Sequence, residues 1–293
     1  MDLLDELQTR ILCGDGAIGT LLLDQGIPLE RCFEELCVTD PERIRTIQQD
    51  YIGAGARVIK TNTFGANAVR LERFGLESRV SEINRAAAQI AQGAAQGKSV
   101  YVAGSVGPLG LTGKEAAGRG IDRELCFREQ IAALLEVGVD LVFFETFTDF
   151  EEMEIAVRAW KKSGNGLALC SFACGPGGRL GSGMILEEAF ARLRALGVSV
   201  VGVNCTDGPK ATVKLVQGIR GEGLLAMYPN AGSPKHGGGR WVYPATPEHF
   251  SQSAREMVAA GARLLGGCCG TTPAHIAAMA AAIAQIPEVR GEK

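Results

Sequence analysis

Two adjacent cysteines near the C-terminus are the residues best suited to chemistry in this chain. Cys268 and Cys269 stand in the segment Gly-Gly-Cys-Cys-Gly-Thr-Thr-Pro, which follows a short apolar run and precedes a predicted helix. Adjacent cysteines rarely form a disulfide with each other, because the required Cα separation and dihedral angle are reached only with strain. The flanking glycines allow the backbone to turn so that both sulfur atoms face one point, as two ligands of one metal ion must.

A third thiol, Cys205, follows another apolar run at residues 201–204. Together the three thiols would form a soft, sulfur-rich site of the kind that zinc prefers. The alternative is that they are inert packing residues, because free cysteine is often simply part of a core. Four other thiols lack metal-ligand spacing and are interpreted as packing residues: Cys32, Cys37, Cys170 and Cys174.

The three histidines are weaker ligand candidates than these thiols. His236 lies in a glycine-rich loop, while His249 and His275 fall early in predicted helices. Surface and capping roles are more common at such positions, so a metal site in this chain would be built mainly from sulfur.

Composition limits the class of protein. A chain of 293 residues that is 46% hydrophobic can bury one barrel-sized core or two smaller ones. The net charge is −3 with no basic stripe, so we expect no nucleic-acid partner. Acids occupy the N-terminus, where a signal peptide would carry Lys or Arg, and the apolar stretches are too short to span a membrane. Nine cysteines in a chain of this size suit reduced thiols and predict a cytoplasmic protein.

The elements that must position these thiols are eight short apolar runs separated by amphipathic segments. The runs are continuous rather than alternating, as expected of parallel strands covered on both faces. Four prolines mark expected helix starts, with Asp40, Thr246 and Thr272 as predicted N-caps. One helical stripe comprises Val80, Ile83, Ala87, Ile90 and Ala94. The predicted strands are 11–13, 58–61, 100–103, 141–144, 167–170, 198–203, 224–227 and 263–265.

This alternation predicts an α/β fold, a single (β/α)8 TIM barrel forming one domain over residues 1–293. An open, doubly wound sheet is the rival fold. The spacing Gly14-x-Gly16-x-x-Gly19 matches a dinucleotide-binding motif, but no acidic strand end follows about 20 residues later.

Polar residues and thiols follow nearly every predicted strand. In such a barrel the chemistry lies on the loops after the carboxyl ends of the strands. Cys205 follows the sixth strand, and the cysteine pair follows the eighth, so the three thiols flank the seventh strand and should converge. In chain order, the residues at the strand ends are Asp15, Asn62, Ser105, Glu145, Asn204, Cys205, Asn230, Cys268 and Cys269.

Three protein thiolates would leave one zinc position open, as in catalytic sites. Such a site suits a substrate thiol as fourth ligand, because binding to zinc removes the thiol proton. The carboxylates of Asp15 and Glu145 could hold an ammonium group, and backbone N–H groups of residues 14–19 could hold a carboxylate. The predicted substrate is therefore an amino-acid thiol that is alkylated at sulfur.

The chain resembles the zinc-dependent homocysteine S-methyltransferase family over essentially its whole length. This resemblance implies a (β/α)8 barrel that activates homocysteine as a zinc-bound thiolate and methylates it to methionine. The motifs that carry it are Asp15–Thr20, Thr61–Gly65, Gly104–Pro108, Phe144–Phe147, Gly202–Cys205, Pro229–Gly232 and Gly266–Pro273.

The resemblance also implies residue roles. Cys205, Cys268 and Cys269 would hold one Zn²⁺ per chain, and Asn230 would fill the open position until the substrate thiol displaces it. Asp15 and Glu145 would bind the homocysteine amino group. The Gly16 and Ala17 amides would lie near its carboxylate, and Ser105 and Asn204 complete the predicted substrate site.

The chain looks most similar to the homocysteine-binding module of cobalamin-dependent methionine synthase. Gly65 stands where the betaine-using branch of the family has tyrosine. The expected methyl donor is therefore methylcobalamin or methylfolate, and the cobalamin or folate would be carried by a partner protein or domain. The glycine-rich segments 107–120 and 232–239 are interpreted as loops at the mouth of the barrel.

Two other functions stay open on the sequence. One is a barrel enzyme that binds a phosphorylated substrate on the loops after strands seven and eight. The other is a non-catalytic module that binds zinc or thiols.

Overall fold

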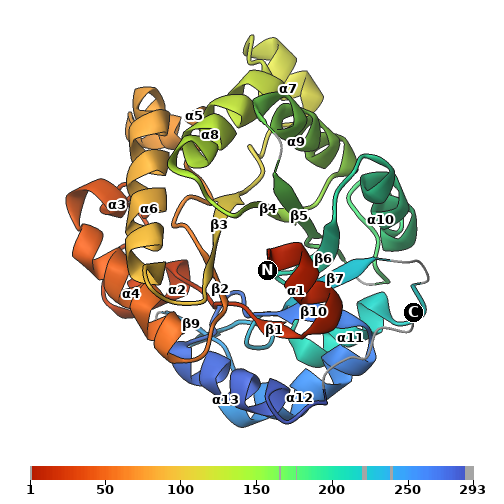
Figure 1. Cartoon of the computed structure of the whole chain (residues 1–293). Coiled ribbons are helices and arrows are strands. Elements are labelled where there is room, and N and C mark those ends of the chain that lie inside the picture. Colours follow the sequence, from red (N-terminus) through yellow and green to blue (C-terminus); the bar gives the residue numbers. More distant parts are fainter. Residues whose placement is uncertain (1, 165, 176, 220–222, 238–239, 288–293) are drawn as a thin grey trace.

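The fold is an eight-stranded, parallel β-barrel surrounded by helices (Figure 1). The computed structural model describes residues 2–164, 166–175, 177–219, 223–237 and 240–287. Neighbouring strands follow the order β1-β10-β7-β6-β5-β4-β3-β2, and a parallel bridge between Gly14 and Val58 joins the two ends. The predicted barrel is confirmed. Its strands are β1 (Leu12–Cys13), β2 (Val58–Lys60), β3 (Tyr101–Val106), β4 (Leu141–Phe147), β5 (Leu167–Phe172), β6 (Val200–Asn204), β7 (Leu224–Tyr228) and β10 (Ala262–Leu265).

Helices form the outer layer of the barrel, and the predicted apolar stripe of residues 80–94 is buried along α6. Two 3-10 turns, Glu72–Phe74 and Glu77–Arg79, precede that helix. The helices are α1 (Leu3–Thr9), α2 (Gly19–Asp24), α3 (Leu36–Thr39), α4 (Pro41–Gly53), α5 (Ala68–Leu71), α6 (Val80–Ala95), α7 (Gly113–Gly118), α8 (Arg123–Val137), α9 (Phe150–Ser163), α10 (Leu186–Ala195), α11 (Pro209–Val216), α12 (Pro247–Ala259) and α13 (Pro273–Ile283).

The predicted helix starts fall at the four prolines, each of which opens a helix. Thr246 caps α12 by accepting a hydrogen bond from the backbone N–H of His249. The prediction that the side chain of Asp40 caps α4 is wrong. This side chain makes no cap hydrogen bond and instead forms an ion pair with Arg43 at 2.7 Å. At α13 the His275 side chain contacts Thr272, as its expected capping role requires.

Two apolar layers hold the barrel together. The larger lies between the sheet and the outer helices. The smaller fills the barrel interior, where Leu3 and Leu7 of α1 pack against strand residues such as Phe143 and Leu264. Helix α1 lies across the amino ends of the strands and closes that end of the barrel (Figure 1). The carboxyl ends are thereby the open ones.

The two glycine-rich segments, expected to be loops, both contain secondary structure. Segment 107–120 contains α7, whose first turn is closed by a capping box between Thr112 and Glu115. Segment 232–239 contains β8 (Lys235–Gly237), which pairs antiparallel with β9 (Arg240–Val242), while residues 238–239 lie outside the described part. Among the described residues, no helix has the length and hydropathy needed to cross a membrane.

Candidate functional site

The three predicted thiol ligands meet at the mouth of the barrel. The sulfur atoms of Cys205, Cys268 and Cys269 all lie within 4.8 Å of one another, and each residue is half-buried. The backbone around β7 holds them there, because Cys205 N–H donates to Tyr228 O (3.1 Å) and Cys268 N–H donates to Pro229 O (2.8 Å). The thiols therefore flank the end of β7, as their positions in the sequence predict.

Two residues of the site adopt left-handed backbone conformations. Cys205 has φ = 55° and Thr146 has φ = 64°, which residues other than glycine rarely adopt. Asn204 holds Thr146 in its left-handed conformation, because Asn204 Oδ1 accepts from Thr146 N–H (2.8 Å) and Asn204 Nδ2 donates to Thr146 Oγ1 (2.7 Å). Strained backbone of this kind concentrates at functional sites, where the surrounding contacts hold it in place.

Asn204 also reaches the thiols. Its Nδ2 lies 3.9 Å from the sulfur of Cys268, and Ser171 Oγ donates to its Oδ1 at 2.9 Å. The residue is fully buried. In this structure Asn204 links β4, β5 and β6 to the loop after β10, and its proposed contact with substrate stays a prediction.

Glycine is required in the loop that carries the cysteine pair. Gly270 has φ = 78°, and a Cβ atom there would lie 2.1 Å from the ring of Tyr243. At Gly267, a Cβ atom would lie 2.4 Å from Thr271 Oγ1. Both contacts are closer than any side chain tolerates, so the glycines allow the loop to fold tightly beneath the two thiols.

The three thiols strongly influence one another's ionisation. Hydrogen bonds from Cys205 and Cys268 lower the pKa of Cys269 to about 3. The hydrogen bonds that Cys205 shares with Cys268 and Cys269 raise its own pKa. The three thiols therefore change one another's ionisation, and a thiol must lose its proton to bind a metal ion.

The spacing fits a metal ion. Zinc–sulfur bonds of about 2.3 Å in a tetrahedron place the sulfur atoms about 3.8 Å apart, within the observed limit of 4.8 Å. Asn230 is buried nearby in the fold, and its side-chain Oδ1 has no hydrogen-bond partner. The adjacent Ala231 N–H donates to Cys269 O, which ties this segment to the thiol loop. An unpartnered buried oxygen beside a thiol loop is compatible with the predicted oxygen ligand.

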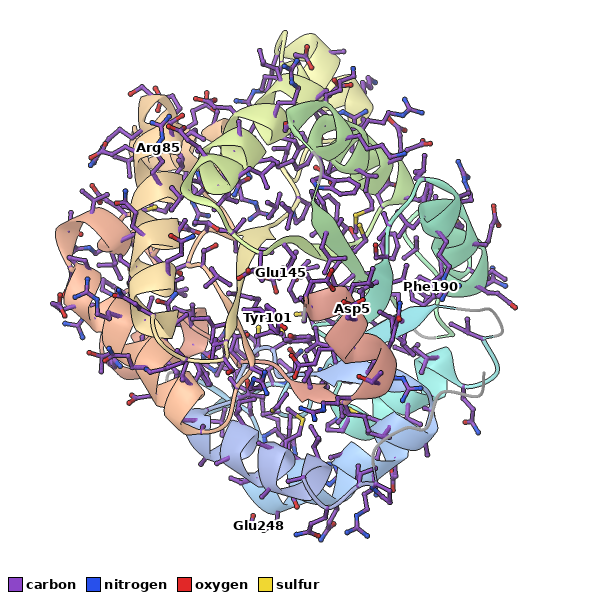
Figure 2. All side chains as sticks on the ribbon, in the orientation of Figure 1. Asp5, Arg85, Tyr101, Glu145, Phe190 and Glu248 are labelled. Carbon is purple, nitrogen blue, oxygen red and sulfur yellow. The ribbon has the colours of Figure 1, made fainter. Side chains whose placement is uncertain are left out.

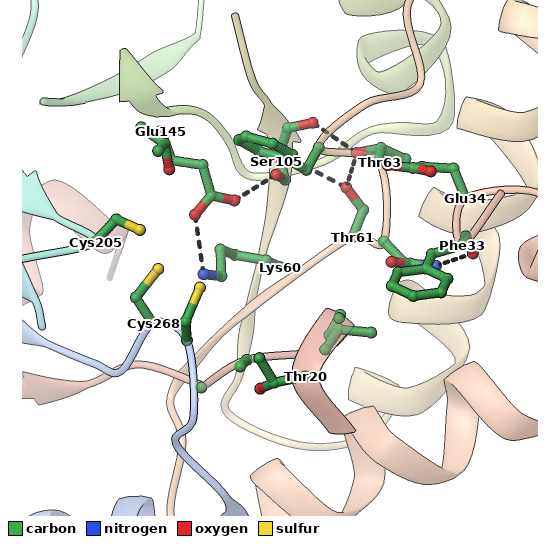
Figure 3. A pocket seen from close by; sticks show the side chains of 18 residues that line it. Thr20, Phe33, Glu34, Lys60, Thr61, Thr63, Ser105, Glu145, Cys205 and Cys268 are labelled. Carbon is green, nitrogen blue, oxygen red and sulfur yellow. Dashed lines mark hydrogen bonds and ion pairs between the residues drawn. The ribbon is translucent and has the colours of Figure 1, made fainter. Parts of the chain in front are cut away.

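A cavity of about 300 Å³ opens in front of the thiols (Figure 3). Most of the predicted site residues line it: Gly16, Ala17, Ser105, Glu145, Cys205, Cys268 and Cys269. Asp15, Asn204 and Asn230 are buried and are not among the residues that line the cavity. The structure therefore gathers the predicted residues at one end of the barrel, and their individual roles stay predictions.

Several cavity residues were not predicted from the sequence. They are Phe33 and Glu34 from the segment before α3, and Lys60 and Phe64 from β2 and the loop after it. Lys60 carries a signal that could have revealed it, because a lysine inside a fully buried strand needs a charged partner. Glu34 lies in an irregular segment whose position the apolar pattern does not indicate.

Lys60 pairs with both predicted ammonium-binding carboxylates. Its Nζ lies 3.2 Å from Glu145 Oε2 and 3.8 Å from Asp15 Oδ1. Figure 3 shows this side chain reaching toward Glu145 beside the thiols, and Figure 2 shows Glu145 near the barrel axis, well inside Arg85 and Glu248 on the outer helices. The cavity wall thus holds a cation between two anions.

Asp15 is held rigidly beneath this pair. Its Oδ2 accepts from the backbone N–H of Lys60 at 2.7 Å, while its Oδ1 has no hydrogen-bond partner. Burial raises the pKa of Asp15 to about 6, even though the Lys60 charge opposes that shift. Asp15 is thus a buried carboxyl whose Oδ1 makes no hydrogen bond and faces the charge of Lys60, and titratable groups perturbed in this way are common at binding sites.

The predicted carboxylate-binding amides are partly engaged. Ala17 N–H donates to Thr271 Oγ1 at 3.1 Å, and Tyr51 donates from its hydroxyl to Ala17 O at 2.7 Å. A Cβ atom at Gly16 would overlap Tyr51 and Thr271. The first loop is therefore fixed against the thiol loop by these contacts.

The loop after β10 does not offer its amides to a phosphate. Amide N–H groups of six residues donate to protein acceptors: Gly266 to Met227 O, Gly267 to Asp15 O, Cys268 to Pro229 O, Gly270 to Thr20 Oγ1, Thr271 to Cys268 O and Thr272 to His275 Nδ1. A phosphate-binding loop needs free N–H groups that point at the ligand. This geometry disfavours the phosphorylated-substrate alternative.

Among the other thiols and histidines, Cys37, Cys170 and His275 are buried in the fold. All nine cysteines are free, and burial raises the pKa of Cys170 and Cys37. His275 contacts Thr272 through Nδ1 and Ala245 O through Nε2, so its ring is used within the fold. These contacts agree with the packing and capping roles expected of them.

Comparisons with known proteins assign the chain to a family. The family model for homocysteine S-methyltransferase matches residues 12–283. The chain belongs to the homocysteine S-methyltransferase family. It is 33% identical to methionine synthase of Mycobacterium tuberculosis and 32% identical to that of Mycobacterium leprae, alignments that cover 97% and 100% of this chain. Each alignment covers 26% of the relative, so the chain spans about a quarter of the length of these curated relatives.

A solved member of the homocysteine S-methyltransferase family has the same fold over nearly its whole length. The metallated form of the homocysteine methyltransferase MmuM from Escherichia coli superposes with a TM-score of 0.77 and 30% sequence identity. The match covers 93% of this chain and 96% of that one. The family predicted from the motifs is confirmed, and one relative in it is known to take a metal.

Proposed function

We propose that this chain is a zinc-dependent homocysteine S-methyltransferase that converts homocysteine to methionine. One observation carries the proposal: three thiols from the ends of β6 and β10 converge within 4.8 Å at the wall of a cavity. Family membership supplies the substrate and the class of reaction. Bound zinc would supply a positive charge that lowers the pKa of a substrate thiol and leaves its sulfur nucleophilic at neutral pH.

The chain's own residues account for binding and orientation. Cys205, Cys268 and Cys269 hold the metal, with Asn230 as a fourth, displaceable ligand. The cavity of about 300 Å³ accepts a small amino-acid thiol and screens the reacting sulfur from bulk water.

The opposite wall of the cavity holds the substrate's polar end. Glu145 and Asp15 bear the charges expected to attract its ammonium group, with Ser105 donating its hydroxyl to Glu145 Oε1. The amides of Gly16 and Ala17 approach its carboxylate, and Asn204 holds the thiol loop against β4.

We further propose that the methyl group comes from methylcobalamin or methylfolate on a partner protein or domain. The open carboxyl end of the barrel supports this, because the cavity at that end is accessible and α1 closes the other end. The methionine synthases that this chain matches are about four times its length, so further modules accompany the corresponding region there. The free state of all nine thiols suits a reducing, cytoplasmic compartment.

The decisive test is methyl transfer to L-homocysteine from a panel of donors: methylcobalamin, methylfolate, S-methylmethionine, S-adenosylmethionine and betaine. We expect zinc-dependent methionine formation with methylcobalamin, and no turnover with betaine. Methionine formation that is equally fast after zinc removal would overturn the metal-dependent mechanism.

A binding measurement separates the enzyme from a non-catalytic module. Homocysteine should release about one proton on binding to the zinc-loaded protein, because a metal-bound thiol is deprotonated. Proton release without turnover with any donor would favour the non-catalytic zinc and thiol module.

A further inference from the structure

A second, smaller pocket lies beside the thiol cavity. Phe33, Glu34 and Phe64 line both of them, so the two spaces share a wall. Figure 3 shows Phe33 and Glu34 across the cavity from Cys205. The second pocket has a volume of about 200 Å³ and is called the arginine pocket here, because three arginines line it: Arg31, Arg70 and Arg73.

The three guanidinium groups have no carboxylate partner among the described residues. Arg31 donates to Thr39 Oγ1 at 3.3 Å, and Arg70 donates from Nε to Pro108 O at 2.7 Å. Arg73 makes no hydrogen bond within the described part of the chain. No carboxylate oxygen of a described residue lies within 4.0 Å of their nitrogen atoms. Since each guanidinium carries several N–H donors, most of these donors remain available to a ligand.

Aromatic rings hold two of these arginines in place. The guanidinium carbon of Arg70 lies 5.3 Å from the ring centroid of Phe64, and that of Arg73 lies 4.4 Å from the ring centroid of Phe74. These contacts restrict both side chains before any ligand binds, which lowers the entropic cost of binding. The planar guanidinium group matches the geometry of a carboxylate or a phosphate.

Glu34 does not neutralise the arginine pocket. Its Oε1 accepts from Gly65 N–H at 2.8 Å, and its Oε2 accepts from the Cys32 thiol at 3.4 Å. Three cations therefore surround one anion, which leaves the pocket positively charged. Burial lowers the pKa of Arg70, the charge of Glu34 opposes that shift, and the charge of Arg73 adds to it. An anion between these arginines would relieve the repulsion.

We propose that the arginine pocket binds an oxyanion of the methyl donor, a phosphate or a carboxylate, while the methyl group of that donor enters the thiol cavity. This inference rests on the proposed function and deepens it by assigning a site to the second substrate. Methylcobalamin carries a phosphodiester, and methylfolate carries the carboxylates of its glutamate tail. The pocket of about 200 Å³ is too small for either donor as a whole and suits one group of a larger molecule.

Two matched pairs of donors test the proposal and distinguish the two oxyanions. Methylcobinamide lacks the phosphodiester and nucleotide of methylcobalamin, and 5-methyltetrahydropteroate lacks the glutamate of 5-methyltetrahydrofolate. Equilibrium dialysis against the zinc-loaded protein without homocysteine gives the dissociation constants. In at least one pair, we expect the member with the oxyanion to bind more than about tenfold more tightly. Smaller differences in both pairs, or no measurable binding of any donor, would overturn the proposal.

Arginine variants test whether the pocket causes this preference. The double variant Arg31→Gln/Arg73→Gln removes two exposed charges and should reduce the preference to less than about threefold. Arg128→Gln is the control, because Arg128 is an exposed arginine of α8 that lines neither pocket, and it should retain the wild-type preference. A ratio of two dissociation constants within one variant does not depend on the fraction of folded protein. A preference that persists in the double variant would place the oxyanion elsewhere and contradict the proposal.

Proton release by homocysteine, measured on the same wild-type protein, separates this inference from the proposed function. If homocysteine releases a proton and is methylated while neither donor pair shows the preference, only the role of the arginine pocket is wrong. If homocysteine releases no proton while the preference depends on Arg31 and Arg73, the thiol-activating function fails and the oxyanion site stands. Should the double variant not fold, Arg73→Gln alone must lower the preference, since this side chain makes no hydrogen bond in the described fold.

Discussion

The thiol cluster depends on the backbone that presents it. Cys205 stands in a left-handed conformation that turns its side chain toward the two thiols of the neighbouring loop. The residue types and their places after the sixth and eighth apolar runs could be predicted, because parallel strands end at one edge of a barrel. The left-handed backbone at Cys205 and Thr146 could not, since φ depends on the surrounding hydrogen bonds rather than on residue type.

Replacing one thiol ligand should abolish metal binding. We expect Cys205→Ala to reduce zinc content from about one per chain to near zero and methyl transfer below detection, because two thiols and one amide make an incomplete site. Metal analysis of purified protein measures this. Cys174→Ala is the matched control, since Cys174 is a half-buried thiol that follows β5 at the same end of the barrel. Equal zinc loss in both variants would indicate general unfolding.

The titration of Asp15 should make the free energy of unfolding depend on pH. Because burial raises its pKa from 3.8 to about 6, the native state keeps a proton that the unfolded chain loses above pH 4. The free energy of unfolding is therefore highest, as far as Asp15 is concerned, below pH 4, where the carboxyl is protonated in both states. It falls as the pH rises from 4 through 6. The loss is on the order of 3 kcal/mol at most, since one pKa unit corresponds to about 1.4 kcal/mol.

Asp15→Asn isolates this effect, because the asparagine Oδ1 can still accept from the backbone of Lys60. Urea unfolding of both proteins at pH 4.5 and pH 7 gives the difference between their free energies of unfolding. The wild-type protein should lose stability relative to the variant as pH rises. A constant difference across that window would contradict the raised pKa.

The ion-pair partners of Lys60 could not be predicted from the sequence. Its place inside an apolar run was visible in the sequence, but its partners are distant in the chain: Asp15 follows β1 and Glu145 belongs to β4. Only the closed barrel brings these three strands to one axis. The charge of the site therefore differs from the one expected from Asp15 and Glu145 alone.

At the scale of the elements, strands were more predictable than loops. Continuous apolar runs located all eight barrel strands, and β3 and β4 extend beyond their predicted ends to include Ser105 and Glu145. The β8–β9 hairpin was missed, because its strands contain glycine and exposed polar residues and lack the apolar pattern of the barrel strands. Backbone pairing rather than burial defines that hairpin.

The tight loop after β10 should tolerate no side chain at Gly270. Gly270→Ala combines a left-handed backbone with a Cβ atom 2.1 Å from Tyr243, so we expect weaker zinc binding and a destabilisation of more than about 1 kcal/mol. Gly261→Ala is the control at the amino end of the same strand, where φ is 100° and no atom lies within 4 Å of the added Cβ. Competition with a zinc chelator and thermal unfolding measure the two effects. Identical zinc affinity in both variants would contradict a steric requirement at Gly270.

At the scale of the whole molecule, the helix that closes the barrel and the candidate site lie at opposite ends of the barrel. Helix α1 seals the amino ends of the strands through Leu3 and Leu7, whereas the thiols and the cavity lie at the carboxyl ends. The predicted barrel explains this division, because only its carboxyl-end loops vary with function. How α1 packs was not foreseen, since a short helix before the first strand has no fixed place in a barrel.

Leu7→Ala tests this division. Removing a fully buried leucine should lower the free energy of unfolding by about 2–5 kcal/mol while zinc content and homocysteine affinity stay unchanged. Leu4→Ala on the same helix is a matched control at a partly exposed position and should cost less than about 1 kcal/mol. Chemical denaturation measures the free energy of unfolding, and titration calorimetry measures the homocysteine affinity. Lost homocysteine affinity in folded Leu7→Ala would show that the two ends are coupled.

Zinc K-edge X-ray absorption of the loaded protein addresses the metal site most directly. The structure predicts three sulfur neighbours at about 2.3 Å and one lighter atom, with one of the sulfurs lost in Cys205→Ser. A spectrum dominated by nitrogen and oxygen neighbours, or one unaffected by that substitution, would contradict the assignment of Cys205, Cys268 and Cys269 as the metal ligands.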